Sequence, residues 1–423
     1  MLEDTYAKIG IIGLGYVGLP LALLCIEKGF SVTGFDTDNK KLELLDIGKS
    51  YITDVNDEEI AEAKCTGRLE VTSEAIKIGE CDILVVCVPT PLKKNKTPNY
   101  IYLFDALTNV AEYLRKGQLI IVESTVVPTT SRDKIIPILE SGGLKAGTDF
   151  YYSFSPERID PGNENFNVGT IPKLVSGSSE DCKQKAADFY RQLGINVYEA
   201  PSLEVAEMAK ILENTYRDIN IALVNQMARI CHVYEINIWD VIEAAASKPF
   251  GFSRFQPGPG VGGHCIPKDS TLYTYFAKLQ GLNATLAECS RKINDGMPAY
   301  IVSRLEALLS ERNKIIKGSS LLILGITYKK DVNDIRESPA FDIIDKLVLK
   351  GAKVSYHDPF IKKLKTAKVH LESISAEDIA QEYDCIILCV AHSFYIRLSY
   401  PENACIFDLT NTLKNKPFDV TLL

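Results

Sequence analysis

Short apolar runs and helical patterns alternate along roughly the first half of the chain. Residues 8–13 (KIGIIG) predict a buried strand, residues 19–29 (LPLALLCIEKG) a helix that ends at Gly29, and residues 31–38 (SVTGFDTD) a second strand. The apolar runs CDILVVCVPT, LIIVEST and FYYSFSPER follow, with helical stretches between them. Because strand–helix–strand units of this kind build parallel sheets, residues 1–200 are expected to form one doubly wound α/β domain.

The pattern changes at Ser202. Residues 202–230 contain no proline or glycine and repeat apolar residues at helical spacing, and Ser202 with Glu204 resembles an N-terminal cap region. This segment predicts one helix of about 28 residues, well above the usual length. It has more apolar positions than one buried stripe needs, so we expect it to link domains and to pack against a second copy of the chain.

Strand and helix patterns resume near residue 319. The runs SSLLILG, SPAFDIIDKLVLKG, AKVSYHDP and DCIILCVAH predict strand, helix, strand and strand, in the order and lengths of the N-terminal half. Asp36 and Asp358 end the two corresponding second strands. We therefore expect two Rossmann-like doubly wound domains joined by a long central helix and a helical middle domain. The expected boundaries are 1–200, 201–312 and 313–423.

Composition narrows the class of protein. Of the 423 residues, 46% are hydrophobic and 24% charged, as in globular chains with room for two or three cores. The net charge of −8 argues against nucleic acid as a partner, so an anionic substrate needs local basic groups. The 11 cysteines form no CxxC pair and the five histidines show no metal-site spacing. A reduced, cytoplasmic protein without a metal is expected.

Residues 9–26 carry no charge over 18 positions, which is long enough for a membrane span. Four glycines and a proline interrupt this stretch, so we interpret it as part of a soluble fold. The preceding segment MLEDTYAK lacks the basic start of a secretory signal, and none is expected.

The glycines of this stretch form a dinucleotide fingerprint. Gly13, Gly15 and Gly18 follow a predicted strand and open a predicted helix, where they permit a tight turn, close approach of a pyrophosphate and close helix–strand packing. Asp36 lies 18 residues after Gly18 and can accept hydrogen bonds from a ribose 2′-hydroxyl, which favours NAD over NADP. The alternative is a glycine-rich turn without a ligand.

A second candidate site lies in the run PGPGVGGHCIPKD, residues 257–269. Glycines 260, 262 and 263 leave the backbone bare, so a substrate could approach it closely. If residues 265–279 form a helix, Cys265 lies at its positive end, which favours thiolate, and Asp269 lies one turn further on. Such a thiol suits covalent chemistry on a carbonyl, whereas a buried structural cysteine is the alternative.

Several charged residues have two interpretations. Lys210 and Asn214 share a face of the long predicted helix and could stabilise a developing oxyanion. Glu157 in SPER, and Lys329 and Arg336 in YKKDVNDIRES, could contact a substrate or phosphates. Each of these residues could equally be an ordinary surface residue.

In this order, the pieces resemble the nucleotide-sugar 6-dehydrogenases, the family of UDP-glucose and GDP-mannose dehydrogenases. The resemblance covers nearly the whole chain and rests on GLGYVGLP, VVCVPTP, ESTVVP, FSPERIDPGN, AEMAKILENTYR, GPGVGGHCIPKD and YKKDVNDIRESPA. It implies an NAD-dependent four-electron oxidation of C6 of a UDP-sugar to the uronic acid. The intermediates would be a thiohemiacetal and then a thioester on Cys265.

The resemblance also implies roles for single residues. Lys210 and Asn214 would polarise the C6 oxygen, Asp269 would orient or activate water with help from Glu157, and Thr125 would hold a water or contact the nicotinamide. The expected NAD contacts are Gly13, Gly15, Tyr16, Val17, Gly18, Asp36, Pro89, Thr90, Thr125 and Arg336. The expected substrate contacts are Glu157, Arg158, Lys210, Asn214, Arg254, Gly262 and Lys329.

Within the family, KPFGFSRFQPGPGVGGHCIPKD and INDGMPAY are similar to the UDP-N-acetylglucosamine 6-dehydrogenase branch. The run Lys268–Asp269–Ser270 is more like UDP-glucose dehydrogenases, so UDP-N-acetylmannosamine and UDP-glucose remain alternative substrates. Two other functions remain open: a two-electron hydroxyacid-type dehydrogenase, and a non-catalytic nucleotide-sugar binding protein. A homodimer through the long helix is expected in each case.

Overall fold

The computed structural model describes residues 7–52, 55–160, 166, 168–398, 400–401, 403–413 and 419–423. The chain folds into two compact units, Met1–Glu213 and Asn214–Leu423. The expectation that no secretory signal precedes the fold concerns residues 1–6, which lie outside the described residues.

The first unit is built on an eight-stranded sheet with the order β3-β2-β1-β4-β5-β6-β7-β8. Its strands are β1 Lys8–Ile12, β2 Ser31–Phe35, β3 Leu69–Thr72, β4 Ile83–Val86, β5 Leu119–Val122, β6 Tyr151–Phe154, β7 Lys173–Gly177 and β8 Val197–Glu199. The strands from β3 to β6 are parallel, whereas β7 runs antiparallel to β6. The order 3-2-1-4-5-6 is that of a Rossmann fold, so the predicted fold class is confirmed.

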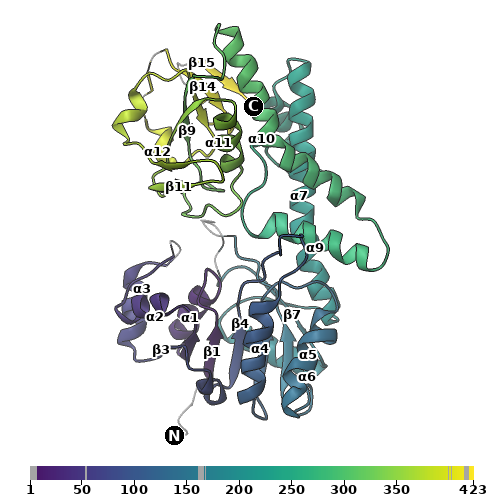
Figure 1. Ribbon diagram of the computed structural model, residues 1–423. Helices are drawn as coiled ribbons and strands as arrows, with labels where there is room; N and C mark the ends of the chain where they lie inside the picture. The colour runs from purple at the N-terminus through teal and green to yellow at the C-terminus, as the bar shows by residue number, and fades with distance from the viewer. Residues whose placement is uncertain are drawn as a thin grey trace. The chain divides into compact units, whose positions relative to one another are not determined.

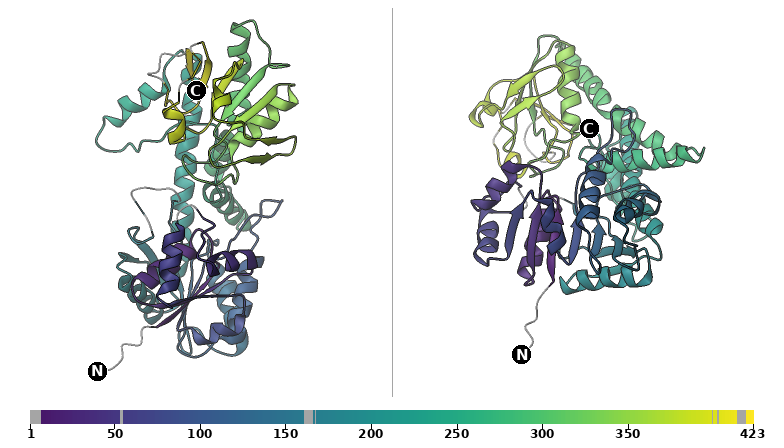
Figure 2. Two further views of the ribbon diagram at one scale, coloured as in Figure 1. Left: turned by 90° about the vertical axis from the view of Figure 1, so that its left-hand side faces the viewer. Right: turned by 60° about the horizontal axis from the view of Figure 1, so that its bottom comes forward.

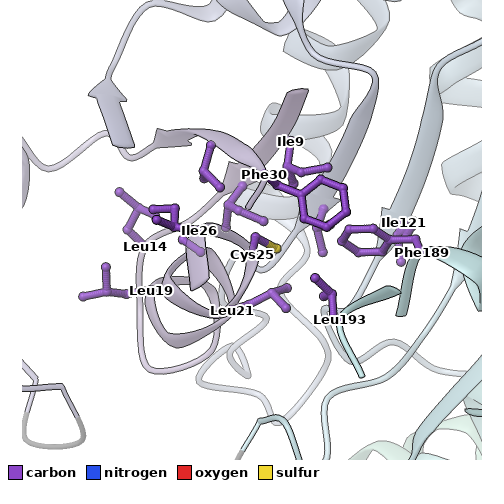
Figure 3. Packing of buried hydrophobic residues seen from close by; sticks show 14 of the residues in the cluster. Ile9, Leu14, Leu19, Leu21, Cys25, Ile26, Phe30, Ile121, Phe189 and Leu193 are labelled. Atoms are coloured by element: carbon purple, nitrogen blue, oxygen red, sulfur yellow. The ribbon is translucent and has the colours of Figure 1, made fainter. Parts of the chain in front are cut away.

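Helices cover both faces of this sheet (Figures 1 and 2). They are α1 Gly18–Glu27, α2 Asn39–Asp46, α3 Asp57–Cys65, α4 Ile101–Tyr113, α5 Ile136–Leu139 and α6 Glu180–Gln192, with shorter helical turns at Ala75–Glu80, Ser131–Ile135 and Glu140–Gly142. Helices α1, α2, α3 and α6 pack on one core, while α4 and α5 pack on the other. In the first core, the rings of Phe30 and Phe189 lie 6.3 Å apart, with Cys25 beside them on the same face of the sheet (Figure 3). Side chains that alternate along the strands thus point into two hydrophobic cores, one on each face of the sheet.

The uncharged stretch 9–26 becomes β1, a glycine turn and α1. Among the described residues, no helix has both the length and the apolar character that crossing a membrane requires.

The long central helix is α7, Leu203–Val233, of 31 residues (Figure 1). The Ser202 hydroxyl accepts a hydrogen bond from Val205 N at 3.3 Å, so the predicted cap is present. The helix continues three residues beyond the predicted end, through Cys231, His232 and Val233.

The second unit carries a five-stranded parallel sheet with the order β10-β9-β13-β14-β15. Its elements are α8 Ile238–Ala246, α9 Cys265–Leu279, α10 Thr285–Glu311, β9 Ser320–Leu324, α11 Pro339–Leu349, β10 Lys353–His357, β11 Lys363–Lys365, β12 His370–Glu372, β13 Cys385–Leu388, α12 Ser393–Ile396, β14 Cys405–Asp408 and β15 Asp419–Leu422. A short turn of helix lies at Glu377–Ala380, and β11 pairs only with β12. This is the second common doubly wound order, so the predicted second domain type is confirmed.

The two sheets repeat one local geometry. Gly13 N donates to Phe35 O at 2.8 Å, and Gly325 N donates to His357 O at 3.1 Å. Both glycines have positive φ, +95° and +79°, which the turn after the first strand requires. The predicted pseudo-repeat is therefore present in the backbone.

Candidate functional site

The three fingerprint glycines have three different environments. Gly13 has a φ of +95°, and a Cβ on Gly18 would lie 2.0 Å from Gly13 O. A Cβ on Gly15 would instead meet no heavy atom of the described residues within 4 Å. The first and third glycines are thus required by the turn and by packing, while the second leaves open space beside the N-terminus of α1, where a pyrophosphate fits.

Asp36 ends β2 beside this turn. Its Oδ2 accepts hydrogen bonds from Leu14 N at 3.0 Å and from Lys41 Nζ at 2.9 Å, and its Oδ1 accepts one from Asp38 N at 3.0 Å. The carboxylate is therefore fixed in one orientation, and Oδ1 retains a lone pair for a ribose hydroxyl.

Two loops at the carboxyl edge of the same sheet are tied together. The Thr90 hydroxyl donates to Thr125 O at 2.9 Å, and the Ser124 hydroxyl donates to Val88 O at 2.7 Å. Pro89 lies between the two bonded positions on the first loop. The structure thus brings together Pro89, Thr90 and Thr125, and their contact with the cofactor stays a prediction.

Glu157 lies after β6 at the same edge, but its carboxylate is engaged. Oε1 accepts hydrogen bonds from Arg158 N and Ile159 N, both at 2.5 Å, and Oε2 accepts one from Lys173 Nζ at 2.8 Å. Arg158 forms an ion pair with Glu213 and donates to Pro172 O at 3.1 Å. Both predicted substrate contacts are therefore held in place by protein bonds.

Lys210 and Asn214 are one turn apart on α7, and each is 7% exposed. Among the described residues of its own unit, no carboxylate pairs with the Lys210 ammonium. Asn214 Nδ2 donates to Asp269 Oδ2 at 2.5 Å. Asp269 is fully buried, and its Oδ1 lies 3.6 Å from Lys268 Nζ without a hydrogen-bond partner among the described residues. That oxygen can accept a bond from water or substrate.

Cys265 is exposed and is the first residue of α9, so the predicted helix begins where the sequence placed it. The glycines before it pack closely against protein atoms. A Cβ on Gly262 would lie 2.7 Å from the Tyr328 Cβ, and one on Gly263 would lie 2.9 Å from the Tyr328 ring. Gly262 and Gly263 must therefore lack side chains because Tyr328 packs against them, whether or not a substrate also approaches there.

Arg336 lies beside the thiol loop. Its backbone oxygen accepts a hydrogen bond from Gly263 N at 2.9 Å, and its guanidinium pairs with Asp334 at 2.6 Å. The bond to Asp334, together with the charge of Cys265, raises the pKa of Arg336. Burial and the charges of Lys268 and Arg336 lower the pKa of His264 to about 3, so the imidazole next to Cys265 is neutral. The imidazole before Cys265 therefore carries no charge at neutral pH, and the Arg336 guanidinium is paired with Asp334.

A cavity of about 300 Å³ lies at the carboxyl ends of β9, β13 and β14. Lys329, a predicted substrate contact, lines this cavity together with Gln256, Gly260, Thr327, Ala391, Thr410 and Thr412. The wall thus combines basic, hydroxyl and amide groups, which suit a phosphorylated, hydrogen-bonding ligand.

This second unit lacks the dinucleotide fingerprint despite its matching strands. Counting from Gly325, Thr327 stands where Gly15 stands in the first unit, and Lys330 stands in place of Gly18. The Asp358 carboxylate accepts hydrogen bonds from the protein itself, among them those from Ile326 N at 2.7 Å and Phe360 N at 2.9 Å. The repeat therefore keeps the fold but not the dinucleotide fingerprint.

One predicted site residue is paired at the surface, and two buried charged residues at the sheet edge were not predicted. Arg254 pairs with Glu243 at the surface of the second unit. Sequence reasoning missed Glu123 and Lys173, which pair with each other at 2.9 Å beneath Glu157. The signal was a charged residue directly after a buried strand, LIIVE, and another that opens one, KLVSG.

Three family models match successive parts of the chain. All three are described as belonging to the UDP-glucose/GDP-mannose dehydrogenase family: an NAD binding domain over residues 7–194, a central domain over 204–296 and a UDP binding domain over 322–415.

Similar proteins extend over almost the full length. A UDP-N-acetyl-D-glucosamine 6-dehydrogenase of Salmonella typhi is 35% identical and aligns over 98% of each chain. A UDP-N-acetyl-D-mannosamine dehydrogenase of Pyrococcus horikoshii is 31% identical and aligns over 97% of each chain. A solved structure of the UDP-D-ManNAc dehydrogenase from Pyrococcus horikoshii has a TM-score of 0.88, 30% identity and 98% coverage of both chains.

Proposed function

Because the chain belongs to the UDP-glucose/GDP-mannose dehydrogenase family and carries its NAD binding domain, we propose that it oxidises C6 of a UDP-N-acetylhexosamine to the uronic acid. The chain is an NAD-using nucleotide-sugar dehydrogenase, and the sugar and the four-electron course are the proposed part. The observation that carries the proposal is the exposed Cys265 at the start of α9, with the bonded pair Asn214 and Asp269 in the same unit.

We assign NAD binding, the covalent chemistry and UDP binding to three successive regions of the chain. Residues 1–200 bind NAD, residues 201–312 carry the thiol and the subunit interface, and residues 313–423 bind the UDP moiety. The cavity lined by Lys329, Thr410 and Thr412 supports the third assignment, because diphosphate and uracil need cationic and hydrogen-bonding groups.

The Cys265 thiol explains how the C6 alcohol is oxidised to an acid without release of the aldehyde intermediate from the protein. Bound NAD supplies a hydride acceptor, and two equivalents are needed for the four electrons. Cys265 attacks the C6 aldehyde carbon and forms a thiohemiacetal, which holds the carbon in place. Loss of a second hydride leaves a thioester, and water then breaks the C–S bond and releases the carboxylate and the Cys265 thiolate.

Lys210 and Asn214 are the proposed donors to the C6 oxygen. The Lys210 ammonium is buried and pairs with no carboxylate among the described residues of its unit, and Asn214 Nδ2 keeps one hydrogen beyond its bond to Asp269. Donors fixed in a buried site stabilise the charge that develops on oxygen. Asp269 Oδ1 is the proposed acceptor for the hydrolytic water, and Glu157 assists as a fixed anion.

The remaining proposed contacts are those that the family resemblance implies. Gly13, Gly15, Tyr16, Val17 and Gly18 hold the pyrophosphate, Asp36 the ribose, and Pro89, Thr90 and Thr125 the nicotinamide side. Arg336 is a proposed contact of the cofactor, and Arg158, Arg254 and Gly262 are proposed contacts of the substrate. The proposed homodimer forms through α7, where Tyr216, Leu223, Met227 and Ile230 are exposed at helical spacing.

UDP-N-acetylglucosamine is the proposed main substrate, and UDP-N-acetylmannosamine is the second candidate because similar proteins carry each name. The test incubates the purified chain and NAD with UDP-N-acetylglucosamine, UDP-N-acetylmannosamine, UDP-glucose and UDP-galactose, and counts NADH per sugar. We expect two NADH per UDP-N-acetylglucosamine and the uronate by mass spectrometry. One NADH per sugar would indicate a two-electron dehydrogenase, and no turnover would leave a binding protein.

A further inference from the structure

A buried group of three charges lies at the carboxyl edge of the first sheet. Glu123 follows β5, Glu157 follows β6, and Lys173 opens β7, which runs antiparallel and therefore starts at this edge. Lys173 Nζ lies 2.9 Å from a carboxylate oxygen of Glu123 and 2.8 Å from one of Glu157. One ammonium thus bridges two carboxylates that come from different strands.

This group holds two carboxylates and one ammonium, and its described surroundings supply no second cation. The Tyr190 hydroxyl donates to Glu123 Oε1 at 2.5 Å, the Tyr190 ring lies 5.3 Å from Lys173 Nζ, and the Cys87 Sγ lies 3.9 Å from Glu123 Oε2. Cys25 is a further titratable neighbour of Glu123, and its thiol is also buried. The described groups that face the two carboxylates therefore include a single cation, Lys173.

Burial affects the two carboxylates in opposite ways. Burial raises the pKa of Glu123 despite the charge of Lys173. Burial alone would also raise the pKa of Glu157, but the Lys173 charge and hydrogen bonds outweigh it and lower that pKa. A proton that enters the group therefore goes to Glu123, and Glu157 remains an anion.

Glu157 is also the member nearest to solvent. Its side chain is 14% exposed, against 0% for Glu123 and 3% for Lys173. Resting on the proposed function, we infer that Lys173 is a positioning residue that holds Glu157 ionised and in one orientation at the reaction site. Glu123 and Tyr190 in turn hold Lys173, so the active-site anion is set by a bond network that runs through the sheet edge.

The inference predicts what happens when the ammonium is removed. In Lys173→Met, two buried carboxylates would face each other without a cation, and Glu157 would compete for a proton near neutral pH. The test measures kcat and KM from pH 6 to pH 9 with NAD and whichever UDP-sugar the wild-type chain oxidises best. We expect kcat of the variant to fall at least tenfold more than wild type between pH 8.5 and pH 6, with KM for NAD changed less than threefold. Lys173→Arg should keep the wild-type profile.

Removing the second carboxylate gives the matched control. The double variant Lys173→Met with Glu123→Gln removes the repulsion between the two carboxylates. Its fall in kcat between pH 8.5 and pH 6 should therefore be smaller than that of Lys173→Met alone. A profile of Lys173→Met that runs parallel to wild type, or a double variant that is worse than the single one, would overturn the inference.

A second readout does not depend on turnover. Two unpaired buried carboxylates bind protons more tightly in the folded state, so the loss of thermal stability in Lys173→Met should be larger at pH 8 than at pH 5.5. An equal loss at both values would contradict the inference even if no UDP-sugar is oxidised, whereas wild-type inactivity with this pH dependence would contradict only the proposed function. If Lys173→Met does not fold, the same comparison is made on the double variant against Glu123→Gln, and a pH-independent difference counts against the inference.

Discussion

Asn214 on α7 donates a hydrogen bond from Nδ2 to Asp269 Oδ2 on α9 at 2.5 Å, and both side chains are buried. The bond ties the helix of the proposed oxyanion donors to the helix that begins at Cys265. It uses one amide hydrogen of Asn214 and one oxygen of Asp269, and leaves one of each for the reaction. A buried bond of this kind to a charged group contributes about 1.5–3 kcal/mol.

Cys265→Ser should abolish formation of the uronic acid. A hydroxyl is a far weaker nucleophile toward the aldehyde, so at most the first oxidation remains. The measurement is the yield of acid and of NADH per sugar. Cys289→Ser, at another exposed cysteine of the same unit, is the matched control and should keep two NADH per sugar. Wild-type acid formation by Cys265→Ser would show that this thiol is not the nucleophile.

Lys210→Ala should lower kcat by about 10²–10³-fold, the usual effect of removing one oxyanion donor. Because the donor acts on charge that appears only in the transition state, KM for the UDP-sugar should change little. Steady-state kinetics at saturating NAD measure both constants. An effect confined to KM would contradict the proposed role.

Asp36→Ala should raise KM for NAD by roughly tenfold and reduce the preference for NAD over NADP, because the ribose loses its acceptor. Asp358→Ala is the comparison, since this carboxylate occupies the same place in the second sheet but its Oδ1 accepts two backbone hydrogen bonds, from Phe360 N and Ile361 N. It should lower stability by about 2–4 kcal/mol and leave KM for NAD unchanged. Equal effects of the two variants on KM for NAD would refute the assignment.

Glu207 gives a pH dependence of stability. It accepts hydrogen bonds from Thr129 N at 2.7 Å and Ser131 N at 2.9 Å, yet burial raises its pKa to about 7. A raised carboxyl pKa means that the folded state binds the proton more tightly, so stability falls as pH rises from about 4.5 to 7.

Glu207→Gln should remove this fall, which amounts to about 3 kcal/mol by linkage. Urea denaturation midpoints at pH 5, 6, 7 and 8 measure it. Glu204→Gln, at a half-buried carboxylate on the same turn of α7 that pairs with Arg132, should leave the dependence in place. Parallel curves for wild type and Glu207→Gln would contradict the prediction.

Leu223→Glu should convert a dimer to a monomer. Leu223 is 55% exposed in the middle of α7, and a charge there would be buried by a second copy of the helix. Light scattering coupled to size exclusion measures the mass. Ile76→Glu, at a similarly exposed residue outside α7, is the control and should not change it. A monomeric wild-type chain would remove the case for this interface.

The sequence by itself determined the features that depend on neighbouring residues along the chain. Period-two and helical patterns predicted the strands, the long helix and both doubly wound sheets, because burial on one face imposes those periods locally. The fingerprint glycines and the start of α9 at Cys265 were also readable, since turns and helix ends need particular residues within a few positions.

Only the tertiary structure decided which distant side chains meet. Glu123, Glu157 and Lys173 are separated by up to 50 residues and appear in sequence as unrelated charges, but parallel and antiparallel strand ends bring them to one edge. Likewise, Asp36 and Asp358 end matching strands, and only the tertiary structure shows that Oδ1 accepts one backbone hydrogen bond in Asp36 but two in Asp358. Local patterns record burial, whereas partner choice depends on how the strands are ordered in the sheet.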